Sequence, residues 1–207
     1  MDDFIDNAVQ IDRQYLLDGK IKEQSDDIVN KKIVEWLESE KIKTLVIKSA
    51  MGTGKTTMIK EILEDDKSLK KILWITHRQT LTKQIYGSFK SLGFKNYMDV
   101  DGCLIKENKI IVQIDSIMRI REYEEDDINF NQYDLVVIDE IEGNMNHYNS
   151  PFLKKSNYSA RDKFKFVIEC IENAKKLLVL DADLGMRTKL FIDNFGSYTM
   201  IYNNYKQ

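Results

Sequence analysis

The sequence predicts an α/β fold in which a parallel sheet is sandwiched between helices. Strand-length runs of Val, Ile and Leu alternate with amphipathic stretches along most of the chain, and one such run leads straight into a loop containing glycine and lysine. Near-continuous apolar strands are typical of parallel sheets that are covered on both faces. The 207 residues are enough for one domain with a substantial core.

Residues 1–43 are expected to form a helical segment that packs on the domain, because helical periodicity runs over Ile11–Leu17 and Ile28–Leu37. Residues 44–207 are expected to form the α/β domain itself. Its expected strands are Thr44–Lys48, Lys71–Thr76, Tyr97–Val100, Ile110–Ile114, Leu135–Ile138, Leu177–Leu180 and Tyr198–Tyr202. Its expected helices are Thr56–Leu63, Thr80–Leu92, Ser159–Ala174 and Leu184–Phe191.

Composition narrows the class of protein. The net charge of −3 gives no overall basic field, so any nucleic-acid contact would have to be local. Cys103 and Cys170 are far apart and form no metal-binding spacing, and His77 and His147 are too isolated for a zinc site. No apolar run reaches the roughly 20 residues of a membrane helix, and the acidic start lacks a signal peptide. These features favour an intracellular, reducing location (cytoplasm or nucleus) without a membrane.

The run Ser49–Thr57 has the pattern of a phosphate-binding loop between a strand and a helix. Gly52 and Gly54 let the backbone curl so that its N–H groups point inward at phosphate oxygens. Lys55 is expected to reach the β- and γ-phosphates, and Thr56 to bind Mg²⁺ through its hydroxyl. The predicted nucleotide-binding residues are Gly52, Thr53, Gly54, Lys55, Thr56 and Thr57. The full pattern would place glycine where this chain has Ser49, and the alternative is a glycine-rich helix start without a ligand.

A second candidate element is the apolar run Leu135–Ile138, which ends in Asp139 and Glu140. Asp139 is placed to hold Mg²⁺ directly or through water. Glu140 could polarise a water molecule for attack on a γ-phosphate, and Lys55, Asp139 and Glu140 are therefore the predicted catalytic residues. The alternative is an acidic strand end that caps the next helix.

Five blocks of sequence occur in order along the chain: residues 49–56, 75–81, 112–119, 139–142 followed by Tyr148-Asn149-Ser150-Pro151, and 180–184. With these blocks the chain resembles the first RecA-like lobe of superfamily 2 helicases. Within that group it is similar to the origin-binding helicases of herpesviruses and to their relatives in other large DNA viruses. The resemblance runs from about Tyr15 to Tyr205.

The resemblance implies an ATP-dependent DNA helicase of DNA replication, with ATP and Mg²⁺ as ligands and single-stranded or forked DNA as partner. It implies backbone contacts to nucleic acid from Thr76, His77, Arg78, Gln113 and Ser116. It also implies that Asp181, Ala182 and Asp183 couple ATP to DNA. Three of these have plain alternatives: Arg78 as a surface arginine at a helix start, Ser116 as a helix N-cap, and Asp181 as a polar strand end.

No clear adenine-reading glutamine motif precedes the loop, and the nearest candidates for adenine contact are Arg13, Gln14 and Tyr15. In the resembled family a second RecA-like lobe, in cis or in trans, brings an arginine finger. The chain stops near the point where that lobe would begin, so we expect a fragment or a truncated gene with little turnover alone.

Two other functions remain open from the sequence. One is a complete small P-loop nucleotide kinase, although the six arginines form no cluster of the kind that a kinase lid needs. The other is a non-catalytic module that binds ATP or DNA. Phosphate release with and without single-stranded DNA distinguishes the three.

Overall fold

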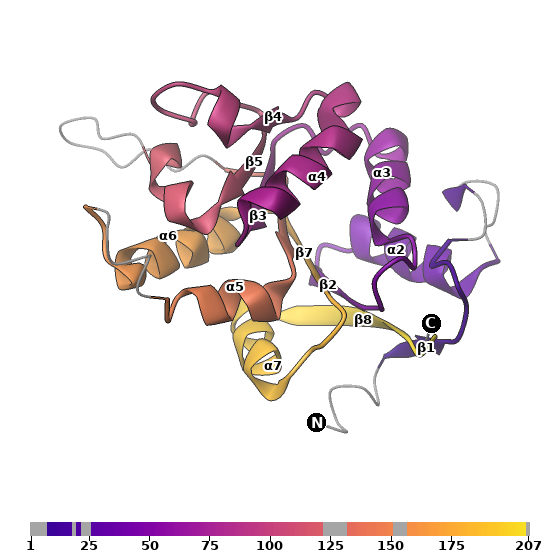
Figure 1. Ribbon diagram of the computed structural model, residues 1–207. Helices are drawn as coiled ribbons and strands as arrows, with labels where there is room; N and C mark the ends of the chain where they lie inside the picture. Colours follow the sequence, from indigo (N-terminus) through magenta and orange to yellow (C-terminus); the bar gives the residue numbers. More distant parts are fainter. Residues whose placement is uncertain (1–7, 18–19, 22–25, 122–131, 151–156, 206–207) are drawn as a thin grey trace.

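The computed structural model describes residues 8–17, 20–21, 26–121, 132–150 and 157–205. They form an eight-stranded sheet in the order β1-β8-β2-β7-β6-β3-β5-β4, in which every pair of neighbours is parallel (Figure 1). The parallel arrangement predicted from the sequence is therefore confirmed. The strands are β1 (Val9–Ile11), β2 (Ile42–Lys48), β3 (Ile72–Thr76), β4 (Lys95–Asn96), β5 (Lys109–Gln113), β6 (Leu135–Asp139), β7 (Lys176–Asp181) and β8 (Ser197–Asn203).

The α-helices connect these strands and cover both faces of the sheet. They are α2 (Ile28–Glu38), α3 (Lys55–Asp65), α4 (Gln79–Phe89), α5 (Ile141–His147), α6 (Ala160–Asn173) and α7 (Met186–Ile192). Short 3₁₀ helices follow several of the elements: η2 (Lys90–Leu92), η3 (Tyr97–Asp99), η4 (Ile114–Ile120) and η6 (Asp193–Phe195).

The two faces of the sheet carry separate apolar layers because successive side chains of a strand point in opposite directions. In β2, Leu45 and Ile47 pack in the layer formed with α2, α3 and α4, whereas Val46 packs in the layer formed with α5, α6 and α7. All three side chains are fully buried. In Figure 1, α2, α3 and α4 lie on one side of the strands, and α5, α6 and α7 lie on the other side. Burial on both faces explains why the strands are continuous apolar runs rather than alternating ones.

Most predicted elements are confirmed, apart from shifts of one to three residues at their ends. The helical prediction for Ile11–Leu17 is wrong. Val9–Ile11 forms β1, which pairs with β8 so that Val9 lies opposite Ile201, and residues 12–17 form no helix. Pairing satisfies the backbone groups of β8, which would otherwise form an open sheet edge, and this tertiary demand outweighs local periodicity.

The strand expected at Tyr97–Val100 is also wrong. That segment forms the 3₁₀ helix η3 instead, directly after the two-residue strand β4. The side chain of Asn96 accepts a hydrogen bond from the Met98 N–H at 3.1 Å. Such a local bond from side chain to backbone turns the chain and competes with strand pairing. Pro151, from the fourth block of the resemblance, lies outside the described residues.

Candidate nucleotide-binding site

The carboxyl ends of β2, β7, β6 and β3 lie next to one another, and the candidate site is built on this edge of the sheet. Lys48 of β2 is level with Asp181 of β7, and Asp139 of β6 is level with Leu180. Open parallel sheets bind ligands at this edge. A cavity of about 790 Å³ lies here, large enough for a nucleotide. It is lined by Tyr15, Leu17, Met51, Gly52, Gly54, Lys55, Thr56, Thr57, Arg78, Leu81, Gln84, Asp139, Glu140, Glu142, Gly143, Asp181, Ala182 and Asp183.

The loop between β2 and α3 has the backbone shape of a phosphate cradle. Gly52 and Gly54 have φ angles of 75° and 82°, in the left-handed region that favours glycine. Gly54 precedes α3, whose first residue is Lys55, so the positive end of the helix faces the loop. The ammonium of Lys55 donates to the carbonyl oxygens of Ser49 at 2.5 Å and Ala50 at 2.8 Å. Its position at the loop centre is the one that a phosphate-binding lysine needs.

Ser49, which stands in place of the pattern's first glycine, has a structural role in the loop. Its side chain is fully buried, and its hydroxyl lies 2.6 Å from the hydroxyl of Thr53. Thr53 in turn donates to the Ala50 carbonyl at 2.8 Å, and the Ser49 N–H donates to the Asp181 carbonyl at 3.0 Å. These bonds brace the loop from inside. Ser49 therefore fits the loop without the freedom of glycine.

Asp139 ends β6 at the base of the cavity. Burial, together with the neighbouring charge of Glu140, raises the pKa of Asp139 to about 7, although the Lys55 ammonium acts in the opposite direction. A bound cation would strongly stabilise the ionised form of a carboxyl group whose pKa is raised in this way. Burial also lowers the pKa of Lys55, while Asp139 and Asp181 oppose that effect. These opposite charges share one enclosed space.

Glu140 connects β6 to α5 in a strained conformation. Its φ of 52° is the only positive φ of a non-glycine residue among those that the structure describes. The amide of Asn144 donates to the carbonyls of Asp139 at 2.6 Å and Glu140 at 3.1 Å, which holds the turn. A left-handed residue costs about 1–2 kcal/mol, and such residues cluster at functional sites.

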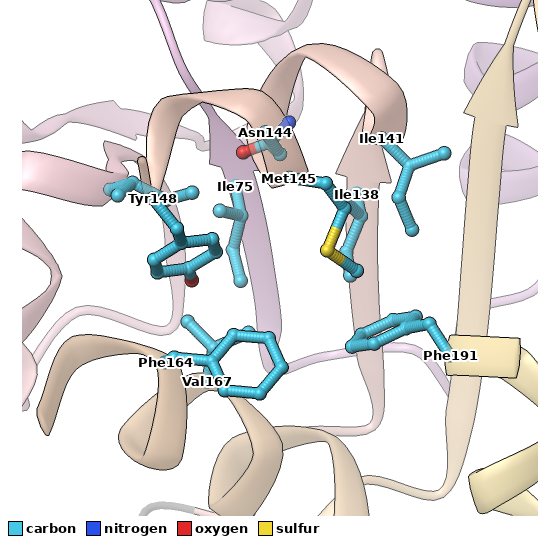
Figure 2. A pocket seen from close by; sticks show the side chains of 10 residues that line it. Ile75, Ile138, Ile141, Asn144, Met145, Tyr148, Phe164, Val167 and Phe191 are labelled. Carbon is cyan, nitrogen blue, oxygen red and sulfur yellow. The ribbon is translucent and has the colours of Figure 1, made fainter. Parts of the chain in front are cut away.

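The core beneath α5 keeps this turn in place. A small cavity of about 10 Å³ lies between α5, α6 and the strands. Figure 2 shows its lining, in which Ile138, Ile141 and Met145 lie near Phe191. Tyr148 packs edge-on against Phe164, with ring centroids 5.1 Å apart. The space is about that of one water molecule, so it belongs to the core and is no second ligand site. Its apolar contacts fix the helix that carries Glu140 at its start.

His77 and Arg78 follow β3, and Arg78 lines the nucleotide cavity. The Arg78 Nη2 lies 2.8 Å from the Glu140 Oε2, and the Arg78 Nε donates to the His77 Nε2 at 2.6 Å. His77 is buried, and burial together with the charge of Arg78 lowers its pKa. A Cβ atom on Gly143 would lie 2.5 Å from the His77 Cε1, so the ring is packed directly against α5. Arg78 does precede a helix, as the plain alternative expects, but it also forms an ion pair with Glu140 that this alternative does not include.

The other residues expected to contact nucleic acid divide by exposure. Thr76 and Gln113 are buried; Thr76 bonds to the hydroxyl of Thr82 at 2.6 Å, and the Gln113 amide donates to the His77 carbonyl at 3.2 Å. Ser116 is partly exposed. The alternative reading of Ser116 as an N-cap is wrong, because η4 already begins at Ile114 and Ser116 lies inside it. Nucleic-acid contact by these residues stays a prediction.

Asp181 links the last two blocks of the resemblance. Its carboxylate accepts hydrogen bonds from three N–H groups, those of Glu142 at 2.8 Å, Ala182 at 2.7 Å and Asp183 at 3.0 Å. Burial nevertheless raises its pKa. The plain alternative, a polar strand end without further contacts, does not describe a carboxylate that holds the start of α5. Coupling of ATP to DNA by Asp181, Ala182 and Asp183 remains a prediction.

The N-terminal segment reaches the site without a helix. The Leu16 N–H donates to the Thr53 carbonyl at 2.9 Å, and the Leu16 side chain is fully buried. Tyr15 lies beside the loop, because a Cβ atom on Gly54 would be 3.7 Å from its Cδ1. Tyr15 is 55% exposed and lines the cavity, whereas Arg13 pairs with Asp27 away from the cavity lining. Of the three adenine candidates, the geometry favours Tyr15.

Sequence reasoning missed the carboxylate of Glu142 as a link between α5 and α7. It accepts from the Gly185 N–H at 3.1 Å and from the Thr188 hydroxyl, and it pairs with Arg187 at 2.5 Å. The separation of about 45 positions gives no local signal for these contacts. The Arg78–Glu140 pair was also missed. The sequence shows only that each residue follows the end of a strand; that β3 and β6 are neighbours is a property of the folded sheet.

The described residues contain no group of three or more His, Cys, Asp or Glu side chains that could hold a metal ion by themselves. Mg²⁺ at Thr56 and Asp139 would therefore need phosphate oxygens and water as further ligands, which is how this ion commonly binds. Within the same residues, no helix is long and apolar enough to cross a membrane.

Comparison with known proteins agrees with this geometry. The family model described as "Origin of replication binding protein" matches residues 12–196. The chain belongs to this family. An Acanthamoeba polyphaga mimivirus protein, provisionally named a replication origin-binding protein, is 58% identical over 99% of this chain and 26% of its own length. An African swine fever virus protein (strain Badajoz 1971 Vero-adapted), provisionally named a helicase/primase complex protein, is 31% identical over 82% of this chain and 16% of its own.

The fold is also that of helicase lobes. A DEAD box protein from Methanococcus jannaschii matches with a TM-score of 0.56 and 18% identity, over 84% of this chain and 48% of that one. The RecA-like fold predicted from the resemblance is therefore confirmed. The chain spans only about a quarter or less of the length of the viral relatives named above.

Proposed function

We propose that this chain is the ATP-binding lobe of a nucleic-acid-dependent ATPase of the viral origin-binding helicase type. One observation carries the proposal: Lys55, Asp139 and Glu140 line the same cavity. Lys55 follows the loop after β2, whereas Asp139 and Glu140 lie at the end of β6. Family membership supports it and argues against the small nucleotide kinase. The names of the viral relatives support a role in DNA replication. We propose single-stranded or forked DNA as the partner.

The residues present fit Mg²⁺ and ATP. The positive φ angles of Gly52 and Gly54 and the helix start at Lys55 suit a triphosphate, and the partly buried Asp139 carboxyl suits a cation. Thr56 and Asp139 would hold Mg²⁺, which when bound neutralises charge on the phosphates. Tyr15 would lie against the base. Glu140 would orient a water molecule as general base.

The chain forms one wall of such a site. In the resembled family, a second RecA-like lobe supplies an arginine whose loss typically costs roughly 10³–10⁵ in rate. We therefore propose a second lobe, in cis or in trans, as a partner. The 207-residue chain alone is expected to bind ATP weakly and to release almost no phosphate.

Titration of a fluorescent ATP analogue against Lys55→Ala tests the phosphate loop. We expect nucleotide affinity to fall at least tenfold with little change in melting temperature, because Lys55 is the chief cation on the phosphates. Lys60→Ala is the matched control, since Lys60 lies on the same helix and forms only a surface pair with Glu64 at 4.0 Å. Equal affinity of the two variants would contradict the loop assignment.

Glu140→Gln separates an ATPase from a passive binding module. In a polypeptide that supplies both lobes, we expect Mg·ATP binding to persist and DNA-stimulated phosphate release to fall by roughly 10²–10⁴-fold. Normal turnover in this variant would remove Glu140 from the reaction. No turnover in the unmodified two-lobe protein, with nucleotide still bound, would favour the module.

A further inference from the structure

Arg78 and Glu140 form an ion pair. Arg78 is the residue expected to bind a nucleic-acid phosphate, and Glu140 is the one expected to orient water. The Arg78 Nη2 lies 2.8 Å from the Glu140 Oε2. The side chain of Arg78 is 62% exposed and that of Glu140 is 33% exposed, so solvent or a ligand can reach the pair. Both line the nucleotide cavity.

Each partner is fixed by the protein around it. His77 is wedged against Gly143, and its ring nitrogen accepts from the Arg78 Nε at 2.6 Å. A neutral imidazole with its lone pair on Nε2 is required for that bond. Glu140 is fixed by the turn that Asn144 braces. The contact between Arg78 and Glu140 therefore depends on the positions of the ends of β3 and β6, which are neighbouring strands.

The pair is nevertheless weak enough to exchange. Exposed ion pairs contribute little to stability, because solvent screens the attraction between the two charges. A guanidinium group binds phosphate at least as well as it binds carboxylate, because its planar fork matches both. A nucleic-acid phosphate placed at Arg78 would thus compete with Glu140 at little cost.

We propose that Arg78 is a positioning residue that holds the Glu140 carboxylate while no nucleic acid is bound, and that a phosphate of single-stranded DNA takes its place on Arg78. The released carboxylate would then be available to the water and triphosphate in the cavity. This inference rests on the proposed function, because it assigns Glu140 to hydrolysis and Arg78 to the DNA backbone. It makes one ion pair the link between DNA binding and the active carboxylate.

A double-mutant cycle on DNA affinity tests the exchange in this chain without any need for turnover. Fluorescence anisotropy with a labelled single-stranded oligonucleotide would compare the unmodified chain with Glu140→Gln, Arg78→Ala and the double variant. We expect Glu140→Gln to bind DNA about 2- to 5-fold more tightly, because it frees Arg78 from a competing charge. Arg78→Ala should bind more weakly, with the salt slope flattened by about 0.7. The double variant should match Arg78→Ala.

Glu64→Gln is the charge-matched control, because Glu64 is exposed on α3 outside the cavity lining and its replacement also removes one negative charge. Its effect should be smaller than that of Glu140→Gln and should persist without Arg78. Equal tightening by both variants, or additive effects in the cycle, would overturn the exchange while leaving DNA binding intact. Absence of DNA binding by every variant would overturn the proposed nucleic-acid function as well, and melting curves would verify that each variant is folded.

A second measurement reports on the carboxylate itself. In a chain labelled with ¹³C at glutamate side chains, the Glu140 carboxyl signal is identified by its loss in Glu140→Gln. We expect added single-stranded DNA to shift this signal in the direction that Arg78→Ala shifts it, and to leave it unmoved in Arg78→Ala. A saturating oligonucleotide that leaves the signal in place would overturn the proposal.

Discussion

The Asp181 carboxylate accepts a hydrogen bond from the Glu142 N–H at 2.8 Å, which ties the end of β7 to the start of α5. Glu142 continues the connection to α7 through Gly185 and Arg187. Two neighbouring strand ends and two helices are thus joined through backbone and carboxylate groups beside the nucleotide cavity. A change at one strand end cannot be absorbed locally.

Glu142→Gln tests this connection. Burial alone raises the pKa of Glu142, but hydrogen bonds from Thr188 and Arg187 outweigh it, and the pKa lies below its ordinary value. The ionised form is therefore the stabilising one, and its contribution is lost as the pH falls through the lowered pKa. At pH 7 we expect a loss of about 1–3 kcal/mol in the free energy of unfolding. Chemical denaturation at pH 7 and at pH 3 measures it; an equal difference at both values would contradict the role of the charge.

Asp139→Asn should stabilise the nucleotide-free protein at high pH. The pKa of Asp139 is raised to about 7, so the folded state favours the protonated carboxyl group. The stability that this group contributes is complete below about pH 4 and is lost as the pH rises through 7. The neutral amide avoids that loss. We expect a melting temperature about 3 °C or more above the unmodified chain at pH 8, in EDTA, with a smaller difference at pH 5. The same variant should lose the Mg²⁺-dependent part of ATP affinity, and a lower melting temperature at pH 8 would contradict the buried charge.

Tyr15→Ala should weaken binding of ATP but not of inorganic triphosphate. The ring lies beside Gly54 and is largely exposed, as a surface that stacks on a base would be. Stacking on an aromatic ring contributes about 1–3 kcal/mol per base, which corresponds to roughly 5- to 150-fold in affinity. Competition titrations with ATP and with inorganic triphosphate measure it, and Tyr15→Phe is the control that should keep affinity. An equal loss for both ligands would assign Tyr15 to the loop rather than to the base.

Gly143→Ala should disturb the contact between α5 and His77. The added methyl group would lie 2.5 Å from the imidazole, and overpacking of this kind costs about 1–3 kcal/mol. Gly87→Ala is the matched control, because Gly87 also lies in a helix but has no atom within 4 Å of an added Cβ. That control should stabilise by about 0.5–1 kcal/mol, since alanine favours helix. Thermal melting of both variants tests the difference, and stabilisation by Gly143→Ala would mean that His77 is free to move.

The sequence by itself determined most of the strands, the phosphate loop and the carboxylates Asp139 and Glu140, whereas β1 and β4 were not predicted. Those features depend on local composition: apolar runs such as Leu135–Ile138 bury both faces, and glycines at fixed spacing allow positive φ angles. The family resemblance was also a property of the sequence, and the match over residues 12–196 confirms it.

Tertiary structure alone decided which distant groups meet. Val9–Ile11 became a strand because β8 offered backbone partners, not because of its own periodicity. Arg78 faces Glu140 because β3 and β6 are neighbours in a sheet whose order differs from the order along the chain. The secondary-structure propensity of a segment carries no information about the order of the strands in the sheet. That order depends on how the connecting helices cover the two faces of the sheet. The pairing of a DNA-contact candidate with a catalytic candidate was therefore visible only in the folded chain.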